Sequence, residues 1–230
     1  MNVIVSIGGS VLAPSVDSDR VAEYGSVLQE LEAAGHTLGV VVGGGPTARE
    51  YITAARDLGA NEIELDQLGV AVTRLNARLL IAALDDRAAP TPIEDHDRAR
   101  EALRRGDIPV MGGTVAGHTT DAVATALAEY TDADLLVYAT SVPGVYDSDP
   151  KANPDAEQYD SLTPSELVDV VSDIDLNAGS NAPVDLLATK LLQRSGLRAV
   201  VLDGSDPACL HDAVAGTHDG TDIVPEGAEE

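Results

Sequence analysis

The stretch that decides the fold is Val40-Val41-Val42-Gly43-Gly44-Gly45-Pro46, followed three residues later by Arg49. A run of valines is typical of a strand buried on both faces of a parallel sheet. The three glycines carry no Cβ, so the backbone can come close to a ligand, and Pro46 suits the first position of a helix. Free amides at that helix start, with Arg49 one turn further on, could bind a phosphate. A tight turn without a ligand would fit the same residues.

The rest of the chain alternates strand-like and helix-like segments with short connections. This pattern predicts an α/β fold, a three-layer αβα sandwich with a mainly parallel central sheet. No linker, internal repeat or low-complexity tract interrupts it, so we expect residues 1–230 to form one domain of two halves, about 1–130 and 131–230. The predicted strands are 2–7, 37–42, 108–111, 134–140 and 198–202. The predicted helices are 18–34, 46–59, 62–84, 95–105, 120–131, 163–171 and 182–195.

Charge is the second informative property. The 230 residues include 39 Asp and Glu against 14 Lys and Arg, a formal net charge of −25, and the acids are spread along the whole chain. Such a field repels nucleic acid and anionic membranes, which argues against both as partners. Dispersed acid, two lysines and the lack of Phe and Trp are typical of a halophilic protein, because molar salt screens self-repulsion.

Location follows from what the sequence lacks. No apolar run approaches the roughly 20 residues that span a membrane, and the first strand begins without a charged leader. One cysteine, Cys209, allows neither an internal disulfide nor a cysteine metal cage. We therefore expect a cytoplasmic protein.

Further turns fall where strands should end. Gly8, Gly9 and Ser10 follow the first strand, and the Ser10 hydroxyl could donate to a phosphate oxygen. The segment Gly112–Thr120 ends at a helix whose first turn holds Asp121, a carboxylate that could organise charged groups around a transferring phosphoryl. The P-loop pattern and the dinucleotide pattern G-x-G-x-x-G are both absent.

Three more side chains suit a nucleotide. After the strand that ends at Thr140, a Pro-Gly turn leads to Tyr146, which offers a stacking face, and to Asp149, which could contact a ribose or Mg²⁺. Asp66 lies on the helix after the Gly43–Gly45 loop and could accept from ribose hydroxyls. His118, between Gly117 and Thr119, is interpreted as a loop residue and not as a general base. Each of these residues could equally be an ordinary turn or surface residue that binds no ligand.

Taken together, these stretches resemble the amino acid kinase family, and within it the archaeal type of uridylate kinase. The resemblance runs over essentially the whole chain, and the order and spacing of its pieces make it specific. The Gly-His-Thr-Thr-Asp stretch favours uridylate kinases over relatives that act on acetylglutamate, aspartate or carbamate. The matching stretches are 7–11, 41–45 with Arg49, 79–84, 108–114, 117–123, 144–146 with Asp149 and Pro150, 188–192 and 219–222.

The resemblance implies transfer of the γ-phosphoryl group of ATP to UMP in pyrimidine nucleotide synthesis, with Mg²⁺ carried by the nucleotide and no metal ligand assigned to the protein. It also implies a homohexamer built from dimers, with UMP bound by the N-terminal half and ATP by the C-terminal half. The catalytic residues would be Asp121 and Arg49. The ATP-binding residues would be Gly8, Gly9, Ser10, Gly45, Arg49, Thr140, Tyr146 and Asp149. The UMP-binding residues would be Gly44, Asp66, Thr114, Val115, Ala116, Gly117, His118, Thr119 and Thr120.

Two positions depart from the family pattern. Ser6 stands where many members carry a lysine, and Pro143 stands where the nucleotide loop often carries an aspartate. Lys190, on the last predicted helix but outside the implied site, is interpreted as a flank residue that pairs with nearby acid. Two alternatives stay open: a kinase of the same family with another small acid or phosphate as acceptor, and a non-catalytic module that binds nucleotides or oxyanions for sensing or storage.

Overall fold

The computed structural model describes residues 1–148, 150, 153, 155–175 and 184–227, and over these residues the chain forms one seven-stranded sheet. The strand order is β3-β2-β1-β4-β6-β7-β5, with every neighbouring pair parallel except β6 and β7. The strands are β1 Asn2–Ile7, β2 Thr37–Val42, β3 Val110–Met111, β4 Leu135–Thr140, β5 Ser161–Leu162, β6 Ala199–Asp203 and β7 Thr221–Ile223.

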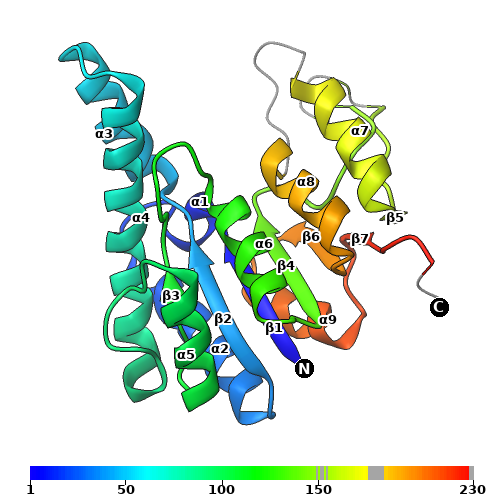
Figure 1. Ribbon diagram of the computed structural model, residues 1–230, viewed down its shortest axis with the longest axis horizontal. Coiled ribbons are helices and arrows are strands. Elements are labelled where there is room, and N and C mark those ends of the chain that lie inside the picture. The colour runs from blue at the N-terminus through cyan, green and yellow to red at the C-terminus, as the bar shows by residue number, and fades with distance from the viewer. Residues whose placement is uncertain (149, 151–152, 154, 176–183, 228–230) are drawn as a thin grey trace.

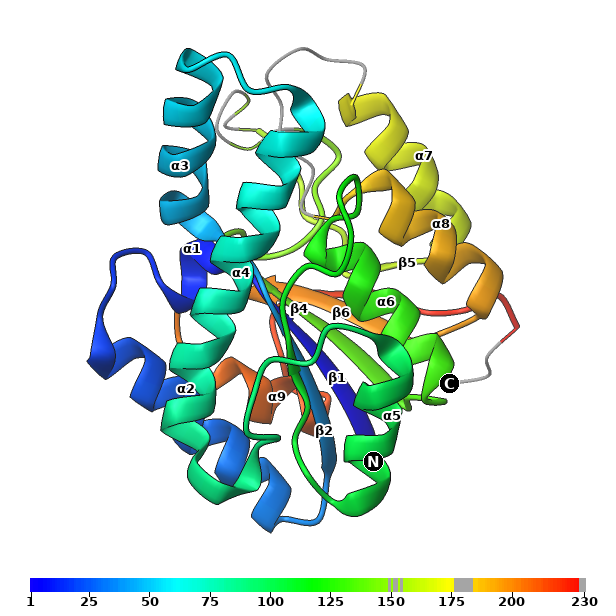
Figure 2. The same cartoon turned by 60° about the vertical axis from the view of Figure 1, so that its left-hand side comes forward.

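Helices cover both faces of this sheet, which confirms the predicted three-layer α/β fold (Figures 1 and 2). On one face lie α2, α4 and α9, and on the other lie α5, α6, α7 and α8. The helices are α1 Gly9–Leu12, α2 Ser18–Ala33, α3 Gly45–Asp57, α4 Glu62–Leu84, α5 His96–Arg105, α6 Thr120–Tyr130, α7 Pro164–Asp175, α8 Leu186–Ser195 and α9 Cys209–Ala215, with a 3₁₀ turn at Asp85–Arg87.

The core forms because the central strands are apolar on both faces. In β1, Val3 and Val5 face the α2–α4 layer, whereas Ile4 faces the α6–α8 layer, and all three are buried. Alternate residues of a strand point to opposite faces, so a continuous apolar strand supplies both cores. The valine run of β2 divides in the same way, with Val41 on the side opposite to its neighbours.

Side-chain caps define where the long helices begin. Asp17 accepts from the backbone N–H of Asp19 at the start of α2. Asn61 and Glu64 form a capping box at the start of α4, and Thr119 caps α6. Each cap satisfies an N–H that has no partner within the helix, a contribution of about 1 kcal/mol.

The predicted elements agree with the structure in the centre of the sheet and differ at its edges. The prediction missed β5 and β7, which have 2 and 3 residues, and the short helices α1 and α9. Strand β3 spans two residues where 108–111 was predicted, although Ile108 makes an isolated bridge to Ala88. Helix α8 begins at Leu186, and residues 182–183 of its prediction lie outside the described part of the chain. Such short elements carry too few residues to show a period.

Helix α4 belongs to the one stretch of the described residues that could cross a membrane by its length and composition. The stretch Glu62–Arg87 is long and apolar enough by composition to cross a membrane, with a mean hydropathy of 1.2. Its inner side packs against α2 and α3 and contributes Ala77, Leu80 and Leu84 to the core. Core helices of soluble proteins share this composition, so the stretch is weak evidence for a membrane span.

The carboxyl ends of the parallel strands meet at one edge of the sheet, and α1, α3 and α6 begin there (Figure 2). Helix α3 and the first turns of α4 rise above this edge on one side, and α7 rises on the other. In open α/β sheets, ligands bind outside the carboxyl ends of the strands. The fold therefore directs the search for a site to this edge.

Candidate active site

Two glycine loops meet at the carboxyl edge in direct backbone contact. A Cβ on Gly9 would lie 2.2 Å from the backbone nitrogen of Gly45 and 2.5 Å from the carbonyl of Gly43. Gly45 also has a φ of +64°, in the left-handed region that favours glycine. These glycines are therefore required for one loop to pack on the other, a role beyond the ligand contact and the tight turn that the sequence predicts.

Beside this contact lies a cavity of about 480 Å³. It is bounded by the β2–α3 loop, by α3 and α4, and by the segment that leads into α6. Its lining residues are Gly44, Gly45, Ala48, Arg49, Ile52, Asp66, Gly69, Val70, Thr73, Gly113, Val115, Gly117, His118, Thr119 and Thr120. Most residues predicted to bind UMP are thus brought together, whereas Thr114 and Ala116 belong to the same segment without lining the cavity.

Arg49 lies at the mouth of the cavity, next to the first glycine loop. Its two terminal nitrogens lie 3.5 and 3.4 Å from the hydroxyl oxygen of Ser10, so the guanidinium links the two loops. The start of α3 has no side-chain cap. Its amides remain available for an anion, and the guanidinium adds a positive charge beside them.

Asp66 lies across the cavity, on α4. Its carboxylate accepts a hydrogen bond of 2.9 Å from the backbone N–H of Gly117, and this bond joins α4 to the 114–120 segment. Gly117 has a φ of +83°, so a glycine suits the turn. Asp66 accordingly fixes one wall of the cavity in addition to any contact with a ligand.

Asp121 lies at the start of α6, between β1 and α8. Ser6 donates a hydrogen bond of 2.9 Å to its carboxylate. Burial raises the pKa of the Asp121 carboxyl from 3.8 to about 7; the hydrogen bond from Ser6 opposes this shift, and the charge of Asp185 adds to it. Ser6, which replaces the lysine of the family pattern, therefore contacts the carboxyl predicted to be catalytic.

The stability of the protein should change with pH because of Asp121. The folded pKa is raised, so the carboxyl stabilises the fold when protonated, and this contribution is lost as pH rises from about 4 through about 7. Relative to the wild type, Asp121→Asn should gain up to about 4 kcal/mol of unfolding free energy between these limits, at about 1.4 kcal/mol for each pKa unit. Denaturant unfolding of both proteins at several pH values in concentrated KCl measures the difference. A difference that does not change with pH would contradict the assignment.

Helix α4 holds the Gly43–Gly45 loop and the segment that begins at Gly112 in place through three residues that were not predicted from the sequence. The buried amide of Asn76 donates to the carbonyl of Gly43 at 2.8 Å. The hydroxyl of Thr73 accepts from the backbone N–H of Gly113 at 2.7 Å. Arg74 donates to the carbonyl of Gly113 at 3.1 Å and to that of Thr114 at 3.2 Å. Polar residues at these positions of a largely apolar helix are the signal that could have revealed them.

Two of the residues predicted for the ATP side, Gly8 and Thr140, lie at the end of β4. The backbone N–H of Gly8 donates to the carbonyl of Ala139 at 2.9 Å, which places the first glycine loop beside Thr140. Thr140 bonds within its own turn, accepting from the N–H of Val142 at 3.2 Å. Tyr146 does not line the cavity; its hydroxyl donates to Gln158 at 3.1 Å. Asp149 lies outside the described residues.

Lys190 is exposed on α8, and its ammonium group donates to Gln193 at 3.4 Å. Within the described part of the chain, its partner is this amide and not the expected acid. Among the described residues, no group of three or more His, Cys, Asp or Glu side chains could hold a metal ion. Mg²⁺ in nucleotide sites keeps several waters and uses phosphate oxygens with one or two carboxylates. A Mg²⁺ ion carried by a nucleotide would therefore need few protein ligands at this edge of the sheet.

The fold and this arrangement of loops define the class of protein. The model of the amino acid kinase family matches residues 1–203, and the chain belongs to that family. It is 69% identical to a protein named uridylate kinase from Haloarcula marismortui, over 98% of this chain and 100% of the relative. A uridylate kinase from Halobacterium salinarum is 64% identical over 100% of this chain and 95% of the relative.

Solved structures agree with this assignment. Uridylate kinase from Archaeoglobus fulgidus superposes with a TM-score of 0.88 at 44% identity, covering 97% of this chain and 100% of that one. UMP kinase from Bacillus anthracis superposes with a TM-score of 0.81 at 24% identity, covering 98% and 96%, which shows a shared fold.

Proposed function

We propose that this chain transfers the γ-phosphoryl group of ATP to UMP, giving UDP. The observation that carries the proposal is the direct backbone contact of two glycine loops at the carboxyl edge, with a cavity on the acceptor side. Two anion-binding loops in contact would place two phosphate groups end to end, as phosphoryl transfer requires. The names of the close relatives, over nearly the full length of both chains, support UMP as the acceptor.

The cavity is the proposed UMP site. All its lining residues lie between Gly44 and Thr120, which supports assignment of the acceptor to the half at about 1–130. Gly44 and the start of α3 would hold the phosphate, and Asp66 would accept from the ribose hydroxyls. The proposed contacts to the uracil and the phosphate come from Thr114, Val115, Ala116, Gly117, His118, Thr119 and Thr120.

The proposed ATP site lies on the other side of the loop contact. Thr140 and Tyr146 come from the half at about 131–230, while the phosphate chain would lie against residues of both loops. These loop residues are Gly8, Gly9, Ser10, Gly45 and Arg49. Asp149 is proposed as a further ATP contact on the resemblance alone.

The chemistry is mainly positioning and neutralisation. The phosphate of UMP is already an anion, so its attack on the γ-phosphorus needs no strong base. When bound with ATP, Mg²⁺ would supply positive charge to the phosphates. Arg49 and the amides of α3 stabilise the charge of the transferring group. Asp121, oriented by Ser6, orders the positive groups at the centre through its ionised form.

The test is an ADP-release assay with Mg·ATP in concentrated KCl, run separately with UMP, CMP, AMP, GMP and acetylglutamate. Turnover with UMP alone supports the proposal. Turnover with another acceptor and none with UMP would instead indicate a kinase of the same family with a different substrate. Folded protein that binds ATP without turnover of any acceptor would indicate a binding module, the alternative that Ser6 in place of a lysine favours.

The setting proposed for this reaction is pyrimidine nucleotide synthesis in a salt-rich cytoplasm. The net charge of −25 supports the need for salt, because screening lowers the repulsion among 39 acids. On the same grounds, we propose that nucleic acid and membranes are not partners.

We also propose a homohexamer built from dimers, and the surface of α4 supports self-association. Leu75 and Leu79 are 57% and 39% exposed on the outer side of this helix, and Ile63 lies on the same helix at 57%. Apolar side chains that gather on a strongly acidic surface usually mark a contact with another chain. A second copy of this chain is the occupant that the proposed oligomer supplies.

Replacing Leu75 with Glu should separate the subunits on this face. A buried, unpaired carboxylate in each copy is costly, so the molar mass in sedimentation should fall to that of a smaller species. The matched control is Leu58→Glu on the exposed end of α3, which should leave the mass unchanged. A mass unaffected by Leu75→Glu would show that α4 is not in the interface.

A further inference from the structure

We propose that Arg20 and Tyr24, two side chains of α2 outside the cavity, are positioning residues for the loops that hold the donor nucleotide. The inference rests on the proposed function, because it takes the loops at Gly8 and Thr140 as the ATP side. Neither residue would touch a substrate. Both act through backbone carbonyls of segments that come together at the end of β4.

Tyr24 is linked to the end of β4 by two consecutive hydrogen bonds through Gly204. Its side chain is fully buried, and its hydroxyl donates a hydrogen bond of 2.6 Å to the carbonyl of Gly204. The backbone N–H of Gly204 in turn donates to the carbonyl of Thr140 at 2.8 Å. Burial raises the pKa of Tyr24, so the hydroxyl keeps its proton and remains a donor. One side chain of α2 is therefore connected to Thr140 through the backbone of a single residue, Gly204.

Gly204 makes this connection rigid. A Cβ at this position would lie 2.8 Å from the hydroxyl of Tyr24, 2.8 Å from Val11 and 2.9 Å from Ala139. The glycine is thus enclosed by α2, by the helix after the first glycine loop and by β4. A displacement of the Tyr24 hydroxyl would therefore also shift Gly204 against Val11 and Ala139, because close-packed interiors transmit strain.

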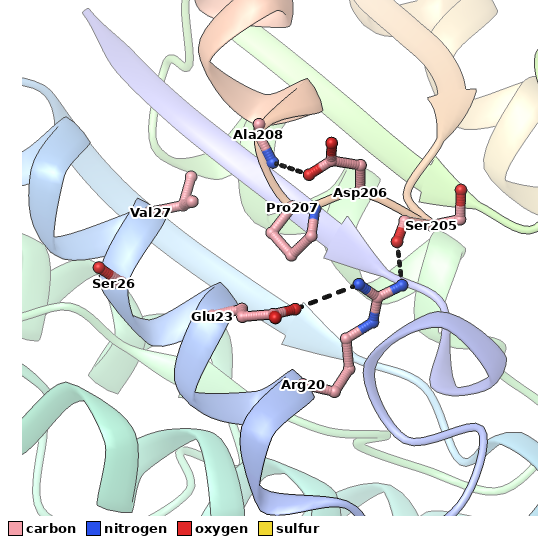
Figure 3. A pocket seen from close by; sticks show the side chains of 8 residues that line it. All are labelled: Arg20, Glu23, Ser26, Val27, Ser205, Asp206, Pro207 and Ala208. Atoms are coloured by element: carbon pink, nitrogen blue, oxygen red, sulfur yellow. Dashed lines mark hydrogen bonds and ion pairs between the residues drawn. The ribbon is translucent and has the colours of Figure 1, made fainter.

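Arg20 holds the same region from the side. Its Nε donates to the carbonyl of Val11 at 3.3 Å, and one terminal nitrogen donates to the carbonyl of Ser205. Figure 3 shows the guanidinium between Ser205 and Glu23, whose carboxylate lies 3.4 Å from the other terminal nitrogen. The planar fork of an arginine can reach two carbonyls and a carboxylate at once, which a lysine cannot do.

The two residues thereby join the segments of the proposed ATP side. Arg20 ties the α1 turn, which follows Gly8, to the β6–α9 loop, and Tyr24 ties that loop to Thr140. The acceptor loop, by contrast, is held from α4 by Asn76. The segments of the ATP side are thus held from α2, whereas the acceptor loop is held from α4. Loss of a hydrogen bond from α2 should therefore weaken ATP binding more than UMP binding.

The experiment measures Mg·ATP affinity by calorimetry, without UMP, together with the KM of each substrate in concentrated KCl. Tyr24→Phe should weaken ATP binding about fivefold, the factor of one lost hydrogen bond, and should leave the KM of UMP unchanged. Arg20→Gln should weaken it about tenfold, because a hydrogen bond from a charged group is stronger, and Arg20→Lys should restore only part of the loss.

The matched control is Leu28→Ala, one turn further along the same helix. Leu28 is fully buried and apolar, so its truncation should lower Tm at least as much as Tyr24→Phe while ATP affinity stays the same. Equal weakening of ATP binding in the control, or a rise in the KM of UMP to the same extent as that of ATP, would overturn the positioning role. A wild type that binds ATP without UMP turnover would overturn the proposed function, and the ATP affinities of the variants would still decide this inference.

Discussion

The Asp121→Asn variant should bind ATP and UMP with nearly unchanged affinity and lose at least about 100-fold in kcat, the scale of losing one preorganised electrostatic group. The substitution keeps the shape of the side chain, and its amide oxygen can still accept from Ser6. What it removes is the negative charge that orders the positive groups around the transferring phosphoryl. Because desolvation raises the pKa of this half-buried carboxyl, removal of its charge should not weaken the fold.

Single-turnover kinetics, with each nucleotide affinity measured separately, would test this expectation. Ser6→Ala is the companion variant: it keeps the carboxylate and removes the hydrogen bond that orients it, so its loss in kcat should be smaller. If Asp121→Asn weakened binding and turnover by the same factor, the organising role would be excluded and Asp121 would be a binding residue.

The second large effect is expected for Arg49→Ala. The guanidinium reaches both glycine loops, so it can follow negative charge as the phosphoryl group moves from one to the other. Its removal should cost about 2–4 kcal/mol in kcat/KM, which is a factor of roughly 30 to 1,000. Arg49→Lys should recover only part of this, because an ammonium group cannot contact both phosphates in one plane.

Arg56 provides the control for Arg49 on the same helix. It pairs with Glu62 at 3.4 Å on an exposed surface, and such pairs contribute at most about 1 kcal/mol. Arg56→Ala should therefore leave kcat/KM within a factor of about 2, given that it lies away from the loops. An unchanged kcat/KM in Arg49→Ala, or an equal loss in both variants, would exclude Arg49 from the reacting centre.

Much of the fold could be predicted because the central strands carry their signal locally. The valine run of β2 and the apolar run of β1 indicate buried parallel strands, and Asp17 and Thr119 mark helix starts by their chemistry. The short strands β5 and β7, at one end of the sheet, could not be predicted in this way. Their few residues pair only because the chain returns to the sheet just before α7 and again after α9, and this is a tertiary effect.

The sequence identified the loops of the candidate site but not the hydrogen bonds that position them. The turns at Gly8, Gly43 and Gly112 could be identified because strand ends and glycines coincide in the sequence. The hydrogen bonds that hold these turns and Asp121 could not be predicted, since Asn76 lies 33 residues from Gly43 and Ser6 lies 115 residues from Asp121. Hydrogen bonds over such separations are made by the sheet order and leave no local pattern.

The contact between Gly9 and Gly45 also limits how this enzyme scaffold can evolve. No side chain lies between the two loops, so no substitution of small size can widen or narrow the gap between the proposed donor and acceptor phosphates in small steps. Any new acceptor must present its phosphate at the same point. Variation in acceptor specificity is therefore confined to other lining positions of the cavity, such as the exposed Val115, whose side chain can change size and polarity without disturbing the backbone junction.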